Sequence, residues 1–209
     1  VGSEMCIRDR CRAWLQLFEE ESAKQNEALF SRMPQFDDID RTTEVITGVD
    51  GNQITLFLHR PKQVGDSIPC IVHVHGGGMV LTSAADPLYV RWRNELARSG
   101  CLVIGVEFRN AAGQLGDHPF PAGLNDCASA LQWANAKRTA LGVSNLLISG
   151  ESGGGNLALA TVLKAKYDGW IEQVDGVFAL CPDISCKYLD AEPQLLSLKE
   201  NEGYIVDTS

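Results

Sequence analysis

The chain has 209 residues with 44% hydrophobic and 22% charged content, and its formal net charge is −9. This length and composition are ordinary for one globular domain. The acidic balance argues against nucleic-acid binding and against a polybasic patch for anionic lipids. No apolar run approaches the ~18 residues of a membrane span, so the sequence predicts no membrane span.

The seven cysteines include no C-x-x-C pair, which argues against a zinc site or a dithiol redox motif. Free thiols in a reducing compartment are the default interpretation, and they favour a cytoplasmic location. The sequence carries no signature of a particular oligomeric state.

Residues 1–10 match the in-frame translation of a sequencing adapter, and a natural polar N-terminus is the alternative. Such segments are left out of fold reasoning. We therefore expect residues 1–10 to make no packed contacts with the core. Residues 11–33 carry Trp, Leu and Phe side chains at helical spacing around a polar middle, which predicts a surface helix.

After this helix, short apolar runs alternate with helical patterns. Asp50-Gly51 separates the first two strand patterns and is a strong hairpin signal. The expected strands cover residues 43–49, 53–60, 69–75, 101–108, 146–149 and 174–181. The expected helices cover residues 87–99, 124–134 and 152–166. The alternation predicts an α/β fold with a mostly parallel sheet and helices on both faces. We expect this sheet to be incomplete at its C-terminal end.

The segment Gly150-Glu151-Ser152-Gly153-Gly154 fits the pattern G-x-S-x-G and stands between a strand and a helix pattern. This pattern is typical of a nucleophile elbow, a sharp strand-to-helix turn that exposes the serine hydroxyl. A glycine-rich helix start is the structural alternative. The strand before the motif and the helix after it favour Ser152 as a catalytic nucleophile, which needs an adjacent base for activation.

A second motif, His75-Gly76-Gly77-Gly78, follows the strand pattern at residues 69–75. Consecutive glycines let backbone N–H groups turn towards a developing oxyanion, and a flexible turn is the alternative. The residue after the nucleophile supplies a further donor in such sites. The predicted oxyanion hole consists of Gly76, Gly77, Gly78 and Gly153, with His75 and Glu151 as supporting residues of the two motifs.

The base for this serine is not evident in the chain. Folds with these motifs carry their triad in the order serine, acid, histidine. The four histidines are His59, His73, His75 and His118, and all of them precede Ser152. We therefore expect the chain to be a fragment whose triad acid and histidine lie beyond its C-terminus, and we expect it to be inactive alone.

Two other kinds of site are weighed and set aside. The glycines that open the helix pattern at residues 152–166 also fit a dinucleotide-binding fingerprint. The acid expected about twenty residues later would end the next strand, whereas Asp175 begins it. His73 and His75 share a strand face and could bind a metal, but no third ligand is nearby in the sequence. The sequence therefore predicts no cofactor and no metal.

Four collinear motifs resemble those of the hormone-sensitive-lipase-like family of α/β-hydrolases. They are His75-Gly76-Gly77-Gly78, Val106-Glu107-Phe108-Arg109, His118-Pro119-Phe120-Pro121-Ala122 and Gly150-Glu151-Ser152-Gly153-Gly154-Gly155-Asn156-Leu157. The resemblance implies an α/β-hydrolase fold and hydrolysis of small-molecule carboxylic esters through a serine acyl-enzyme, without a cofactor. It also implies that residues 11–40 belong to a partial cap and that residues 41–209 are the N-terminal part of a catalytic domain.

The chain departs from the family pattern at several positions. Glu151 stands where the family usually has aspartate, Gly153 where it has alanine, and Met79 where an aromatic often follows the glycine loop. Three functions stay open at this point. The first is a carboxylesterase, and the second is a non-catalytic, receptor-like protein that binds small molecules. The third is an amidase or lactonase of the same fold.

Overall fold

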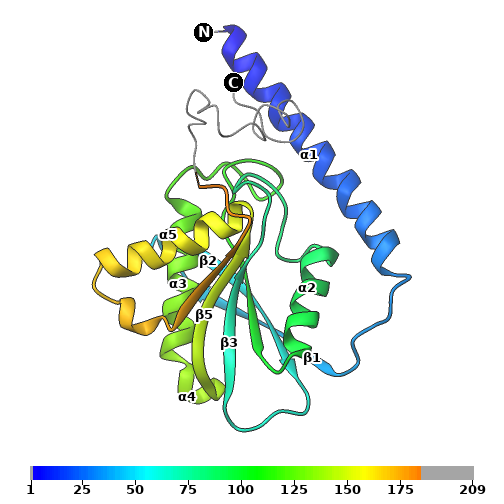
Figure 1. The fold of residues 1–209 in the computed structure, drawn as a ribbon. Coiled ribbons are helices and arrows are strands. Elements are labelled where there is room, and N and C mark those ends of the chain that lie inside the picture. The colour runs from blue at the N-terminus through cyan, green and yellow to red at the C-terminus, as the bar shows by residue number, and fades with distance from the viewer. Residues whose placement is uncertain (1, 185–209) are drawn as a thin grey trace, which may run out of the picture.

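The computed structural model describes residues 2–184, with side chains from residue 11 onward. Its strands are β1 (Ile39–Thr47), β2 (Gln53–Pro61), β3 (Ile68–Val74), β4 (Leu102–Glu107), β5 (Val143–Glu151) and β6 (Gly176–Leu180). Its helices are α1 (Gly2–Phe30), α2 (Pro87–Arg98), α3 (Ala122–Ala136), α4 (Arg138–Leu141), α5 (Gly153–Tyr167) and the short 3-10 helix η1 (Ile171–Gln173). The strands form a six-stranded sheet in the order β1-β2-β4-β3-β5-β6 (Figure 1).

The predicted α/β architecture with a mostly parallel sheet is confirmed. Strands β4, β3, β5 and β6 run parallel, while the hairpin β1–β2 is antiparallel and β2 pairs antiparallel with β4. The predicted hairpin turn is present, with Gly51 at φ +79°. Each parallel connection passes through a helix, because neighbouring parallel strands need a crossover to return the chain to the same edge.

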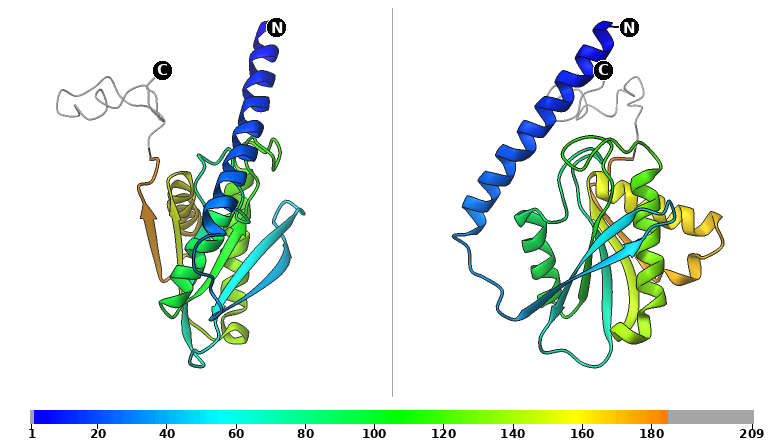
Figure 2. Two further views of the ribbon diagram at one scale, coloured as in Figure 1. Left: turned by 90° about the vertical axis from the view of Figure 1, so that its right-hand side faces the viewer. Right: turned by 180° about the vertical axis from the view of Figure 1, so that it is seen from behind.

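The helices cover both faces of the sheet, as expected from the alternating pattern. Helix α2 packs on β4, β2 and β1, while α3 and α5 contact each other and lie on the opposite face (Figures 1 and 2). The central strands are therefore buried on two sides, which explains their nearly continuous apolar sequences. Val72, Ile104 and Ile148, which are paired across these strands, are fully buried.

Helix α1 differs from its predicted bounds of residues 11–33. It begins at Gly2 and ends at Phe30. Its end lies shortly before Pro34, and helices usually end at or before the residue that precedes a proline. We expected residues 1–10 to make no packed contacts with the core, and this prediction stays open because the side chains of these residues lie outside the described part of the structure. Strand β1 begins at Ile39, so the expected domain boundary after residue 40 falls inside a strand. No helix in the described part of the chain could cross a bilayer.

Strand β6 forms one edge of the described sheet and carries exposed apolar side chains. Phe178 is 59% exposed and Leu180 is 45% exposed. Most of the loop expected after residue 181 lies outside the described residues. The C-terminal ends of the parallel neighbours β3 and β5 lie side by side at one end of the sheet. The glycine motif follows β3, and the elbow motif spans the junction of β5 and α5.

Candidate active site

The elbow is a tight turn between β5 and α5. Ser152 has φ +53° and ψ −122°, a backbone conformation that is strained for any residue other than glycine. Ser152 is also exposed to solvent. Its backbone is held on both sides, since Ser152 N–H donates to Leu180 O at 2.9 Å and Asn156 N–H donates to Ser152 O at 3.0 Å. The turn therefore presents Ser152 at the end of the sheet.

The glycines around Ser152 are required by close backbone contacts. A Cβ added at Gly154 would lie 2.2 Å from Val74 O and 2.4 Å from His75 O. The start of α5 therefore presses directly against the end of β3. Both obstructing atoms belong to the backbone, so a side chain at this position would force the strand and the helix apart.

The glycine loop lies against the residue that follows Ser152. A Cβ added at Gly153 would lie 2.7 Å from Met79 N and 2.8 Å from Gly78 Cα. Gly77 and Gly78 have φ +103° and +63°, and Gly77 O accepts from the two amides that close the next turn. The two motifs, far apart in the sequence, thus meet at one place in the structure.

Gly76 holds a different position from the one predicted for it. Its N–H donates to Glu151 Oε1 at 3.0 Å, so in this structure the amide that was predicted to bind an oxyanion has a carboxylate as its acceptor. Gly76 O accepts from His75 Nδ1 at 2.8 Å and from Thr82 Oγ1 at 3.0 Å. Gly76 therefore connects the glycine loop to Glu151, His75 and Thr82.

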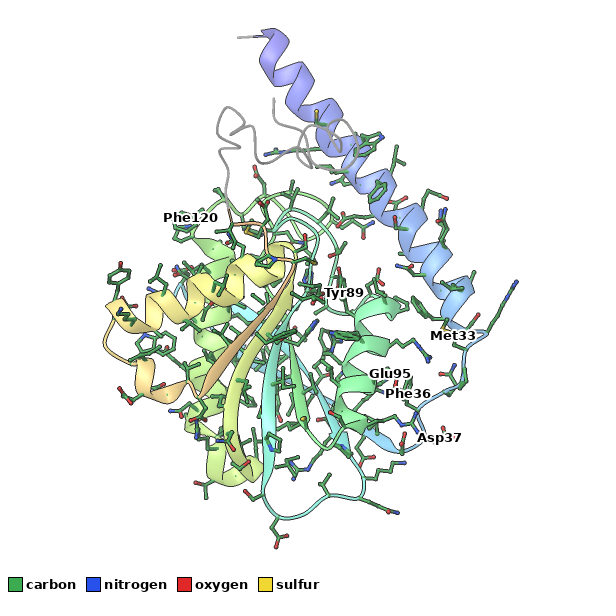
Figure 3. The ribbon with its side chains drawn as sticks, in the orientation of Figure 1. Met33, Phe36, Asp37, Tyr89, Glu95 and Phe120 are labelled. Carbon is green, nitrogen blue, oxygen red and sulfur yellow. The ribbon has the colours of Figure 1, made fainter. Side chains whose placement is uncertain are left out.

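His75 is enclosed beneath the loop. Its ring is fully buried and stacks on Phe108 with ring centroids 4.2 Å apart, and Tyr89 lies on another side at 5.2 Å. Figure 3 shows Tyr89 on α2, near the end of the strands that carry the two motifs. Burial lowers the pKa of His75 to about 4, so the ring is neutral at neutral pH. These contacts support the predicted structural role of His75 in shaping the loop.

Two of the other histidines, His59 and His73, are buried under α2. His59 is bonded to Asn94 at 2.7 Å and to Arg93 Nε at 3.1 Å, and burial lowers its pKa to about 4. His73 lies 3.0 Å from Glu151. His118 is half-buried, and its backbone N–H donates to Asn110 O at 2.9 Å. Among residues 11–184, no three His, Cys, Asp or Glu side chains gather as a metal site would require.

The charged residues at and just after the end of β4 form two separate clusters. Arg109 bridges Asp126 at 2.9 Å and Asp50 at 2.6 Å. Glu107 accepts from Ser83 Oγ at 2.6 Å and from the backbone of the loop before α2.

Sequence reasoning missed Arg93, which is completely buried. A Cβ added at Gly105 would lie 2.6 Å from Arg93 Nε, and Arg93 Nη2 donates to Ala84 O at 2.6 Å. A signal for it exists, since Tyr89, Arg93 and Ala97 follow helical spacing on the buried face of α2. A charged residue in such a row indicates a buried polar centre.

The chain is similar in sequence to known hydrolases. A family profile described as alpha/beta hydrolase fold matches residues 71–209. The chain belongs to the α/β-hydrolase family. Within it, the carboxylesterase NlhH of Mycobacterium tuberculosis is 32% identical over 134 residues, covering 62% of this chain and 40% of that protein. The hormone-sensitive lipase of Bos taurus is 30% identical over 146 residues, covering 68% of this chain and 18% of the lipase.

Solved structures of esterases are similar to nearly the whole length of this chain. Brefeldin A esterase, a bacterial homologue of human hormone-sensitive lipase, has a TM-score of 0.80 and 39% identity, covering 94% of this chain and 57% of that chain. The esterase Est22 has a TM-score of 0.74 and 33% identity, covering 58% of its own length. The predicted resemblance to hormone-sensitive-lipase-like hydrolases is confirmed. The chain spans less than half of the two curated relatives named above.

Proposed function

We propose that the protein containing this chain hydrolyses carboxylic esters through an acyl-enzyme formed on Ser152. The observation that carries the proposal is the contact between the glycine loop and Gly153, next to a strained and exposed Ser152. The names of the relatives, which include carboxylesterases and a lipase, support the same reaction class. The substrate is a small ester, and no cofactor takes part.

The reaction proceeds in two halves. Ser152 Oγ attacks the ester carbonyl carbon while a base takes its proton, and the carbonyl oxygen becomes an oxyanion. The N–H groups of Gly77, Gly78 and Gly153 donate to this oxyanion. The C–O bond to the alcohol then breaks and the alcohol leaves with the proton. Water attacks the acyl-enzyme through a second oxyanion, releasing the carboxylic acid and restoring Ser152.

The base and its acid come from outside the described residues. His59 and His75 are buried, bonded and held neutral, and His73 is bonded to Glu151. We therefore propose that the 209-residue chain alone shows negligible esterase activity. Serine hydrolases that lack triad members still retain roughly 10³–10⁴-fold catalysis over water from the oxyanion hole and binding.

The test compares hydrolysis of p-nitrophenyl butyrate by the 209-residue chain and by the longer natural protein. We expect turnover only in the longer protein, and Ser152→Ala should abolish it. Binding of ester without hydrolysis by the longer protein would favour the receptor-like alternative. Ordinary turnover by the 209-residue chain, lost on Ser152→Ala, would show that a histidine within it acts as the base, and His118 would then be the first to examine.

A further inference from the structure

Glu151 lies where the two motifs can be joined by one side chain. It is the last residue of β5 and directly precedes Ser152. In the parallel pairing of β3 with β5, His73 is opposite Ser149. Side chains alternate along a strand, so His73, Ser149 and Glu151 share one face of the sheet. This is the face that α2 covers.

Each carboxylate oxygen of Glu151 has its own partner. Oε1 accepts from Gly76 N–H at 3.0 Å, and Oε2 accepts from His73 Nε2 at 3.0 Å. The His73 side chain is 1% exposed, and that of Glu151 is 22% exposed, so solvent competes little for these bonds. Hydrogen bonds to a charged acceptor are about twice as strong as those between neutral groups. The carboxylate therefore links β3 and the glycine loop to the elbow.

Both backbone polar groups of Gly76, its N–H and its carbonyl oxygen, are hydrogen-bonded to side chains. Its N–H is bound by Glu151, and its carbonyl oxygen is bound by His75 and Thr82. Gly76 is also covalently next to Gly77, just as Glu151 is next to Ser152. A shift of the Glu151 carboxylate would consequently move the proposed oxyanion donors relative to the proposed nucleophile.

The charges around Glu151 favour its ionised form. Burial alone would raise the pKa of Glu151, but the hydrogen bonds from His73 and Gly76 outweigh burial and bring this pKa below the ordinary glutamate value. Arg93, buried on the same face, adds an attractive charge. At neutral pH the carboxylate is therefore an acceptor for both partners, with no proton of its own to donate.

We propose that Glu151 is a positioning residue that sets the glycine loop against the nucleophile elbow, and that His73 fixes the orientation of its carboxylate. This inference rests on the proposed function. Glutamate is one methylene longer than the aspartate usual in the resembling family, and this length lets a single side chain reach both Gly76 and His73 here. Glu151 is separated in the sequence from Gly76 by 75 positions and from His73 by 78 positions.

The first test follows the Gly76 amide resonance of the 209-residue chain by NMR during acid titration. In the unsubstituted chain we expect the resonance to shift with a midpoint below that of ordinary glutamate. Glu151→Gln should abolish this titration, and His73→Leu should move the midpoint upward because the carboxylate loses a donor. Glu95→Gln is the matched control, since Glu95 is exposed on α2 and pairs only with Arg91 among the described residues. An unchanged Gly76 titration in Glu151→Gln would overturn the proposal.

The second test measures kinetics in the longer natural protein. Misplacing reacting groups by about 1 Å can cost a factor of about 10² in rate, so Glu151→Gln should lower kcat roughly 10- to 100-fold. KM should change little, and Glu151→Asp should restore part of the loss. Unchanged kcat in Glu151→Gln would overturn the positioning role. A longer protein without any esterase activity would contradict the proposed function, while the Gly76 titration would still decide the contact made by Glu151.

Discussion

At the scale of single residues, the site depends on close backbone contacts that only glycine permits. The start of α5 meets the end of β3 at Gly154, and the glycine loop meets the elbow at Gly153. The motif G-x-S-x-G encodes both contacts, so Ser152 and its glycines could be predicted from the sequence. The bond between Glu151 and His73 could not, because it depends on the register of two strands that are distant in the chain.

We predict that Gly154→Ala destabilises the fold, because its Cβ would collide with Val74 O and His75 O. Overpacking of this kind costs about 1–3 kcal/mol. The matched control is Gly65→Ala, where an added Cβ meets no atom within 4 Å and φ is not positive. Urea unfolding of the two variants measures the difference. Equal stability of both variants would mean that the strand and helix are not in contact as described.

At the scale of elements, the buried carboxylate of Glu19 connects α1 to the loops beside the candidate site. Glu19 is 8% exposed, although it lies on a helix with many exposed side chains. Its oxygens accept from Thr82 N–H at 2.5 Å and from Gln114 N–H at 2.7 Å. Thr82 in turn bonds Gly76 O, so α1 is connected to the glycine loop. The sequence predicted a surface helix here, but the row of polar residues in its middle concealed this attachment.

We predict that Glu19→Ala loosens two loops at once. Removing the carboxylate leaves the amides of Thr82 and Gln114 without their acceptor, a loss that costs about 1–3 kcal/mol for a buried group. Hydrogen exchange should therefore accelerate at both amides. Glu20→Ala, one position along on the exposed side of α1, should leave their exchange unchanged. Protection that survives Glu19→Ala would show that α1 does not hold these loops.

Helix and strand positions were largely predictable because the apolar periodicity is strong, and the sheet covered on both faces follows from the strand–helix alternation. The helix expected from the sequence extends three residues beyond the end of α1, because apolar side chains continue to Met33. Pro34 disfavours helical backbone at the residue before it. The buried polar centre under α2 could not be predicted from the sequence, because Arg93 and Asn94 are residue types that usually face solvent on a helix.

At the scale of the whole molecule, buried histidines make stability depend on pH. His59 and His75 have folded-state pKa values of about 4, below the ordinary value of 6.5. The unfolded chain therefore binds protons between about pH 6.5 and pH 4 that the folded chain resists, and stability falls as the pH falls through this range.

We predict that the free energy of unfolding decreases steadily from pH 7 to pH 4, by up to about 1.4 kcal/mol per pH unit for each histidine. Urea unfolding at a series of pH values measures this decrease as a falling midpoint. His59→Gln, which removes one of the two titrating groups, should reduce the slope. A stability that is constant between pH 7 and pH 5 would contradict the burial of these rings. The lowered pKa of Glu151 adds a further loss at more acid pH, in the same direction.

The central claim is that Ser152, presented by the elbow beside the glycine loop, is the nucleophile of an esterase. The most direct measurement is mass spectrometry of a longer protein that contains this chain, after reaction with a fluorophosphonate, with tandem fragmentation to locate the adduct. We expect one adduct per chain, on the peptide containing Ser152, and none in Ser152→Ala. An adduct on a different residue, or ester turnover that continues without any adduct on Ser152, would contradict the account.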